Sequence, residues 1–231
     1  RVYVYSIANF PTFRCAEQIR NDVAYHNLPV TIVSVGGGLS YGNMGYSHHA
    51  VQDYSLMRSF PNMRICAPGD PLELKSIMKI IENSSNPYYL RLGRGGEKVI
   101  HNSEPTIIPG TWLELLRPKN NKIFLSTGAA LSYAQELIEN NKSYSDYGLF
   151  SLPIWGMDLK SEQKEFLEKY KEIIVIEDHL VDGGFGSWIL ECMYESNITS
   201  YPKITLLGLD KKVTGMVGSQ DFLNRIGWNI E

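Results

Sequence analysis

The sequence predicts an α/β fold made of two consecutive domains with mostly parallel sheets. Strand-like apolar runs alternate with helical patterns, and the connections are long enough to return each strand parallel to the one before. Between residues 93 and 121 this alternation stops, and glycine and proline replace any sustained period. We therefore predict one domain over residues 1–96, a linker over 97–121 and a second domain over 122–231.

The first domain is expected to hold four strands, over residues 2–7, 30–35, 63–67 and 88–92. Its clearest helix start is at Asp70, which can cap free N–H groups. Pro71 takes the first helical position, and Glu73 lies three residues after the cap. Shorter helical patterns lie over residues 13–24 and 50–58.

The linker is expected to carry at most one short strand, around residues 106–108. Strand and helix then alternate again through the second domain. Strands are predicted over 122–127, 147–152, 172–176 and 204–207, and helices over 129–139, 161–170, 185–194 and 219–226.

Composition argues against several kinds of partner. The net charge is −3 with both signs mixed, which gives no electrostatic case for nucleic acid. No apolar run reaches the ~18 residues that a membrane span needs. Cys15, Cys66 and Cys192 are few and far apart, which indicates buried apolar residues in a reducing compartment. We predict a cytoplasmic protein. Because the chain opens at Arg1 directly in a strand, we also expect further sequence upstream.

A glycine-rich segment, Gly36–Gly45, follows the second strand. Glycine lets a backbone turn and approach a ligand closely, although a flexible connector explains the cluster about as well. The segment is neither a P-loop nor a dinucleotide fingerprint. His48 and His49 come next, and an imidazole can transfer protons near neutral pH. Neighbouring side chains point in different directions, so we expect His48 to face a site and His49 to pack.

Arg91 and Arg94 lie where the fourth strand ends. Open α/β sheets bind ligands at strand carboxyl ends, and arginine suits phosphate or carboxylate, but a solvated loop arginine is an equal alternative. Phe10 and Phe13 follow the first strand. They are either core residues, which is the default, or a stacking platform for a flat heterocycle.

Three further features have simpler interpretations. Gly183, Gly184 and Gly186 open a helix after a strand, which is compatible with an anion site, but tight helix–strand packing is favoured. His26 and His101 are expected to be exposed polar residues.

Five stretches together resemble the transketolase group of thiamine-diphosphate enzymes. They are YSIANFPTFRCAEQIRND, GNMGYSHHAVQDYSLMRSFPNMRICAPGDPLEL, PYYLRLGR, IVIEDHLVDGGFGSW and LLGLDKKVTGMVGSQDFL. The resemblance covers nearly the whole chain and is nearest to the C-terminal half of a split transketolase. It implies part of a pyrimidine-binding domain over 1–96 and a transketolase C-terminal domain over 122–231.

The resemblance also implies roles for particular residues. His48 would face the substrate near the thiazolium carbon, as the catalytic proton donor or a hydrogen-bond partner. Arg94 would meet the substrate's distal phosphate or hydroxyls. Phe10 or Phe13 would stack on the aminopyrimidine, with Arg14 as a possible occupant of that position instead.

Departures from the family pattern carry information as well. Gly36, Met44 and Tyr46 stand where sugar-phosphate transketolases usually have His, Asp and Pro. Losing two polar contacts implies that the donor is not bound as an ordinary ketose phosphate. The family's catalytic Glu and the domain that holds diphosphate and Mg²⁺ lie outside this chain. Activity is therefore expected only with a diphosphate-binding domain or partner chain, in a homo- or hetero-oligomer.

The resemblance implies a transferase of carbohydrate metabolism that moves a two-carbon ketol unit between sugars, sugar derivatives or sugar-phosphate-like substrates. The alternatives are a β-type subunit of a 2-oxo acid dehydrogenase, a 1-deoxyxylulose-5-phosphate synthase-like enzyme, or a non-catalytic partner subunit. In each case we expect no nucleic-acid and no membrane partner.

Overall fold

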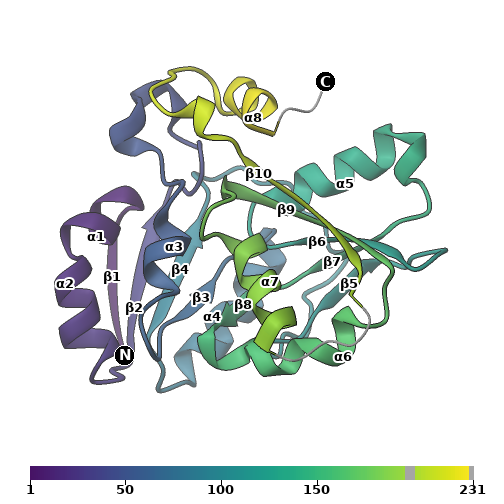
Figure 1. Ribbon diagram of the computed structural model, residues 1–231. Helices are drawn as coiled ribbons and strands as arrows, with labels where there is room; N and C mark the ends of the chain where they lie inside the picture. Colours follow the sequence, from purple (N-terminus) through teal and green to yellow (C-terminus); the bar gives the residue numbers. More distant parts are fainter. Residues whose placement is uncertain (196–200, 229–231) are drawn as a thin grey trace.

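Two mixed five-stranded sheets with helices against them make up the molecule (Figure 1). The structure is a computed structural model that describes residues 1–195 and 201–228. The predicted α/β class is confirmed. Residues 196–200 and 229–231 of the predicted second domain lie outside the described residues.

The first sheet has the order β1-β2-β4-β3-β8. Its strands are β1 (Val2–Ile7), β2 (Val30–Val35), β4 (Tyr88–Leu92), β3 (Arg64–Cys66) and β8 (Ile154–Gly156). The first four are parallel, and β8 runs antiparallel to β3. Since β8 comes from the far side of the predicted linker, this sheet is built from both parts of the chain.

The helices around this sheet are short except for one. They are α1 (Asn9–Arg14), α2 (Ala16–Gln18), η1 (Ile19–Ala24), η2 (Gly42–Met44), η3 (Tyr46–His48), α3 (Asp53–Met57) and α4 (Pro71–Glu82). The predicted start of α4 is confirmed, because the Asp70 carboxylate accepts the N–H groups of Leu72 and Glu73. The helix predicted over 13–24 is instead interrupted at Cys15, which leaves helical geometry.

The second sheet has the order β10-β9-β6-β7-β5. Its strands are β10 (Lys203–Leu209), β9 (Glu172–Leu180), β6 (Lys122–Ser126), β7 (Gly148–Ser151) and β5 (Leu113–Leu116). Only β5 is antiparallel to its neighbour. The strand predicted at 106–108 is wrong. The strand in this segment is β5, and its pairing with β7 lies too far along the chain for local pattern to indicate it.

The helices around the second sheet are α5 (Ala130–Asn140), η4 (Lys142–Tyr144), η5 (Met157–Gln163), α6 (Lys164–Leu167), α7 (Phe185–Glu195), η6 (Lys211–Val213) and α8 (Gln220–Trp228). The helix predicted over 161–170 is reduced to α6, because the tighter 3-10 turn η5 precedes it.

The largest apolar core joins the two sheets. Trp155 on β8 is fully buried, and its ring lies 5.2 Å from that of Tyr54 and 5.4 Å from that of Trp188 between centroids. Tyr54 belongs to α3 and Trp188 to α7, so side chains from both parts of the chain pack on the same strand. Burial on this scale supplies the main stabilisation of the junction.

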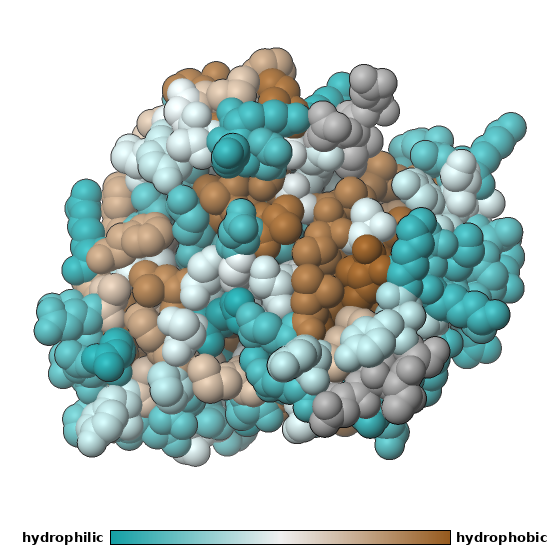
Figure 2. Space-filling view, in the orientation of Figure 1, coloured by the Kyte–Doolittle hydropathy of each residue, from teal (hydrophilic) through white to brown (hydrophobic). Residues whose placement is uncertain are grey.

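Each sheet also leaves one apolar edge partly uncovered. On edge strand β1, Val2, Tyr3, Val4 and Tyr5 are exposed, with Tyr5 at 72%. Figure 2 shows apolar surface gathered near edge strand β10, where residues 204–207 are partly exposed. No helix among the described residues is long and apolar enough to cross a membrane.

The cysteines do not all behave as predicted. Cys66 and Cys192 are buried and unpaired. The prediction is wrong for Cys15, which is exposed at the break between α1 and α2.

Candidate functional site

The glycine-rich segment turns tightly over the ends of β2 and β4. Gly36 (φ +87°) and Gly37 donate their N–H groups to the Leu92 carbonyl at 2.9 Å. A Cβ added at Gly36 would lie 2.1 Å from the Tyr41 ring. Any other residue at position 36 would therefore clash with the Tyr41 ring. It would also have a strained backbone, because the φ angle there is positive.

His48 lies at the end of η3 and contacts Phe10 at the start of α1. The two ring centroids are 5.3 Å apart in an edge-on arrangement, and the Ser47 hydroxyl lies 3.0 Å from His48 Nδ1. The Asn9 side-chain amide donates to the Ser47 carbonyl at 2.9 Å, which fastens α1 to the turn that carries His48. The structure thus brings together two of the predicted site residues, Phe10 and His48.

His49 points the other way and packs. Its side chain is 1% exposed, and Nε2 lies 3.4 Å from the Gly42 carbonyl. Burial lowers the pKa of His49, so the ring is neutral at neutral pH. His48, by contrast, is partly exposed. That it faces a site stays a prediction.

Phe13 and Arg14 lie one turn further along α1. Phe13 is 47% exposed, and the Arg14 guanidinium covers one face of the Phe10 ring at 4.5 Å from its centroid. Asn9 Oδ1 is buried without a hydrogen-bond partner among the described residues. A flat ring that carries an amino group fits this set, because aromatic surface and an unpaired acceptor lie on neighbouring residues.

Arg94 lines no described cavity together with Phe10 or His48. It is exposed in the loop after β4 and lines two cavities, of about 860 Å³ and 310 Å³. The smaller cavity lies at the carboxyl ends of β1, β2 and β4, against Tyr5, Val35 and Leu92. Neither cavity is lined by His48 or Phe10.

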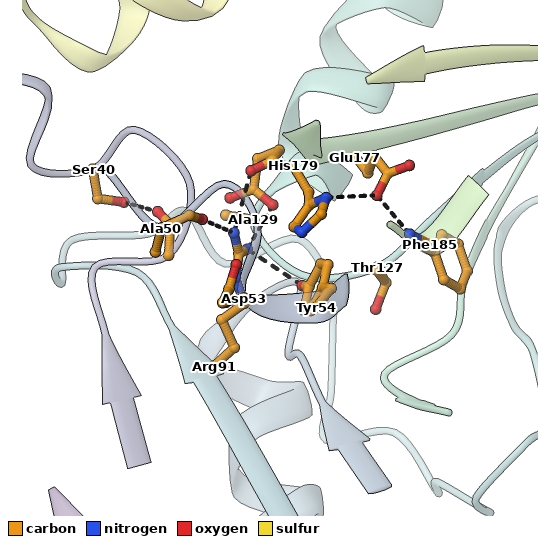
Figure 3. A network of polar contacts seen from close by, with 12 residues as sticks. Ser40, Ala50, Asp53, Tyr54, Arg91, Thr127, Ala129, Glu177, His179 and Phe185 are labelled. Carbon is orange, nitrogen blue, oxygen red and sulfur yellow. Dashed lines mark hydrogen bonds and ion pairs between the residues drawn. The ribbon is translucent and has the colours of Figure 1, made fainter. Parts of the chain in front are cut away.

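Arg91, only three residues away, is not available to a ligand (Figure 3). It is 3% exposed, and it donates to Asp53 and to Asp178, each at 2.7 Å. Its guanidinium also lies over the Tyr54 ring at 4.3 Å. Burial opposes the charge, but Asp178 and Asp53 outweigh it and raise the pKa of Arg91. Since Asp178 belongs to β9, this arginine joins the two sheets.

The glycine turn before α7 is filled by the chain's own carboxylate. Glu177 accepts the N–H group of Phe185 at 2.6 Å (Figure 3). It also accepts the N–H group of Gly186 at 2.9 Å. Burial raises the pKa of Glu177 to about 8. The favoured packing interpretation of these glycines is confirmed, and the helix N-terminus has no room for an external anion.

His101 corrects another expectation, because it is not an exposed polar residue. Its Nδ1 lies 3.1 Å from Asp70, which also accepts the backbone N–H groups of Ile100 and His101. Glu73, 3.8 Å from His101 Nε2, is fully buried, and burial raises its pKa to about 7. Asp70 therefore holds the segment after the Arg94 loop in place.

Sequence reasoning missed the acidic side chains of this junction. Glu177 and Asp178 follow four apolar residues in the buried strand β9, and Asp53 is the first residue of α3. The sequence did contain a signal for them, because charged residues in a strand that must be buried need partners inside the protein. Among residues 1–195 and 201–228, no group of three or more His, Cys, Asp or Glu could hold a metal ion.

Comparison with known proteins finds one family match and several similar sequences. The transketolase pyrimidine-binding domain family matches residues 1–96. A subunit of the apulose-4-phosphate transketolase of Actinobacillus succinogenes is 30% identical over 81% of this chain and 60% of its own length. The 1-deoxy-D-xylulose-5-phosphate synthase of Aquifex aeolicus is 34% identical over 97% of this chain and 36% of its own length.

A similar fold occurs in a solved structure described as a split gene transketolase, inactive beta4 tetramer. It aligns with a TM-score of 0.79 at 23% identity, over 98% of this chain and 70% of its own. This chain thus spans only part of each of these proteins. Residues 1–96 match the transketolase pyrimidine-binding domain family, and the chain as a whole is similar to a transketolase subunit and to a 1-deoxy-D-xylulose-5-phosphate synthase.

Proposed function

We propose that this chain supplies one wall of a thiamine-diphosphate-dependent, transketolase-like active site. The reaction is the transfer of a two-carbon ketol unit between sugars or sugar derivatives. One observation carries the proposal: in a domain that matches the pyrimidine-binding family, Asn9, Phe10 and His48 converge beyond the carboxyl end of β1. Ligands of open α/β sheets bind at such edges.

The residues at this edge suit the pyrimidine end of the cofactor. Phe10, or the more exposed Phe13, offers aromatic surface for stacking, and Asn9 Oδ1 is an unpaired acceptor for an amino group. When bound, thiamine diphosphate supplies the carbon nucleophile that carries the two-carbon unit. This chain's part is to orient the flat ring and to shield it from water.

His48 is the proposed catalytic residue. Its Nδ1 is held by the Ser47 hydroxyl, while Nε2 has no hydrogen-bond partner among the described residues. Nε2 can therefore donate a hydrogen bond to a substrate oxygen or transfer a proton to it. The buried, neutral His49 cannot replace it, because its side chain packs away from the edge.

Arg94 is proposed to meet the distal phosphate or hydroxyls of the substrate. It is exposed, and no carboxylate of the described chain pairs with it. Met44 and Tyr46, exposed at 58% and 43%, offer mainly apolar surface where the family usually has Asp and Pro. We infer that the donor differs from an ordinary ketose phosphate, because a polyol chain would lack hydrogen-bond partners there.

A diphosphate-binding domain or subunit is proposed to complete the site and to hold Mg²⁺ with the diphosphate. The names of two similar proteins, one a transketolase subunit and the other a split gene transketolase, support a two-chain arrangement. We propose a homo- or hetero-oligomer on this basis, and a cytoplasmic location because Cys66 and Cys192 are unpaired.

A second candidate is a transfer that starts from a 2-oxo acid and releases CO₂. The 1-deoxy-D-xylulose-5-phosphate synthase of Aquifex aeolicus favours it, at 34% identity over 97% of this chain. Assays of the complete enzyme with a ketose donor and with pyruvate separate the two reactions, since only the second releases CO₂.

The decisive experiment reconstitutes the full protein with its diphosphate-binding partner and compares His48→Ala with His26→Ala. We expect His48→Ala to lower turnover by about 10²–10⁴-fold, the usual contribution of a general acid or base. His26 is exposed and lies beside Tyr25, so its variant is the matched control and should retain full turnover. Equal turnover of the two variants, or an inactive reconstituted wild type, would contradict the proposal.

A further inference from the structure

The loop that carries His48 is closed by a pair of backbone hydrogen bonds. The Gly38 N–H donates to the Ala50 carbonyl at 2.8 Å, and the Ala50 N–H donates to the Gly38 carbonyl at 2.9 Å. We call residues 38–50 the histidine loop. Ala50 is fully buried, whereas His48, two residues earlier, is partly exposed. The position of His48 therefore depends on what holds the closed end of this loop.

The carboxyl end of β9, a strand of the second sheet, holds that closed end. Arg91 Nη2 donates to the Ala50 carbonyl at 2.9 Å and to the Asp178 carbonyl at 3.2 Å. Its Nη1 donates to the Asp178 carboxylate at 2.7 Å. Figure 3 shows Arg91 beside Ala50. The Leu180 N–H donates to the Val51 carbonyl at 3.0 Å, directly after the loop. One guanidinium and one strand end thus fix the same short piece of backbone.

The rest of the histidine loop also packs on the second part of the chain. A Cβ added at Gly38 (φ +63°) would lie 2.5 Å from Asp178 Oδ2 and 2.9 Å from the Asp178 carbonyl oxygen. At Gly42 it would lie 2.6 Å from the Gly218 carbonyl oxygen, and the Gly218 N–H donates to the Gly42 carbonyl at 3.3 Å. Because Asp178 is 1% exposed and in direct contact with the loop, a change in its hydrogen bonds cannot be absorbed by solvent.

We propose that Asp178 is a positioning residue for His48, because it fixes the closed end of the histidine loop through Arg91. Asp178 acts on the backbone of the loop and not on the substrate. The inference rests on the proposed function, in which His48 is the catalytic residue. It adds that a carboxylate of the second sheet determines where the imidazole of the first part of the chain lies.

Hydrogen exchange measures the loop without any assay of activity. The experiment compares the full-length wild type, Asp178→Asn and Glu191→Gln by mass spectrometry of their peptides. Asp178→Asn keeps the shape of the side chain but removes its charge. Peptides that cover residues 38–51 should exchange about tenfold faster in this variant, because its bond from Arg91 is no longer charge-assisted on both sides.

Glu191→Gln is the matched control. Glu191 forms an ion pair with Arg58 at 2.8 Å, which also links the two parts of the chain. Neither residue is hydrogen-bonded to residues 38–51 within the described chain. The control therefore loses a carboxylate of the same kind of link, but its exchange over residues 38–51 and its turnover should equal those of the wild type.

Turnover of the reconstituted enzyme measures the consequence for His48. Asp178→Asn should lower kcat by about 10–10²-fold, because a small displacement of a catalytic group is costly. In the His48→Ala background the same substitution should cause no further loss, since the residue that it positions is absent. A merely structural role of Asp178 would lower kcat by the same factor in both backgrounds, which would overturn the proposal.

Arg91→Lys keeps the test decisive if Asp178→Asn does not fold. Lysine retains the positive charge but lacks the guanidinium fork that reaches Ala50 and Asp178 together, so the same two effects are expected. Wild-type exchange over residues 38–51 in the variants would also overturn the proposal. Full turnover of His48→Ala would instead contradict the proposed function, and the exchange rates alone would then decide whether Asp178 fixes the loop.

Discussion

Arg91 and Arg94 are three residues apart, yet they lie in opposite surroundings. Arg91 is buried between Asp53 and Asp178 and joins the two sheets, whereas Arg94 is exposed on a glycine-rich loop without an ion pair in the described chain. The difference shows how the same residue type serves two purposes. An arginine with two internal carboxylates stabilises the fold, while one without a partner is free to bind a ligand.

The largest loss of unfolding free energy should come from Arg91→Met. It leaves Asp53 and Asp178 buried without their cation, a change that typically costs about 3–5 kcal/mol of the free energy of unfolding. Urea denaturation followed by circular dichroism measures this loss. Arg94→Met is the matched control and should unfold at nearly the wild-type midpoint. Equal midpoints for the two variants would remove the contrast between the two arginines.

A smaller effect on the free energy of unfolding, dependent on pH, should come from Glu73→Gln. This variant tests whether buried Glu73, beside Asp70 at the start of α4, also affects stability. Burial raises the pKa of Glu73 to about 7 from its ordinary 4.5, with the Gly69 amide and Ser151 hydroxyl partly opposing the shift. The folded state therefore holds this proton more tightly. The contribution of protonated Glu73 to the free energy of unfolding is fully present below pH 4.5. It falls by about 1 kcal/mol per pH unit as the pH rises to about 7.

The measurement is the difference in unfolding free energy between wild type and Glu73→Gln across this pH range. The wild type should lose stability relative to the variant as pH rises. Glu17→Gln, at an exposed position on α2, controls for the loss of a charge. Its unfolding free energy should change with pH as that of the wild type does. A constant difference between wild type and Glu73→Gln would contradict the prediction.

The smallest effect should come from Lys98→Ala, on the loop that carries Arg94. Its ion pair with Glu136 is formed by two exposed side chains, and such pairs contribute little because solvent screens them. The urea midpoint should not change measurably, at low or at high salt. A clear loss of stability would show that the Arg94 loop is fixed as firmly as the Arg91 junction.

Local signals predicted local structure well. Asp70 caps α4 as its sequence indicates, and the parallel strands β1 to β4 lie where their apolar runs predict. Long-range pairing was not predictable. The strand β8 has three residues and pairs with β3, about ninety positions earlier, so no periodicity could show it.

The candidate site was only partly predictable, for the same reason. The contact between Phe10 and His48 follows from where the first strand and the glycine segment end, and the sequence contains both signals. Whether Arg91 or Arg94 is free depends on Asp178, a carboxylate 87 residues away. Their roles in catalysis and binding stay predictions until the variants above are measured.

The pairing of β8 with β3 affects where the protein can be shortened. A fragment that stops at residue 96 lacks the strand that closes one side of the first sheet. In such a fragment both edge strands, β1 and β3, would expose unpaired backbone N–H and C=O groups. Exposed edges of this kind favour aggregation. A fragment that keeps the first sheet whole must extend beyond Gly156, sixty residues past the family boundary.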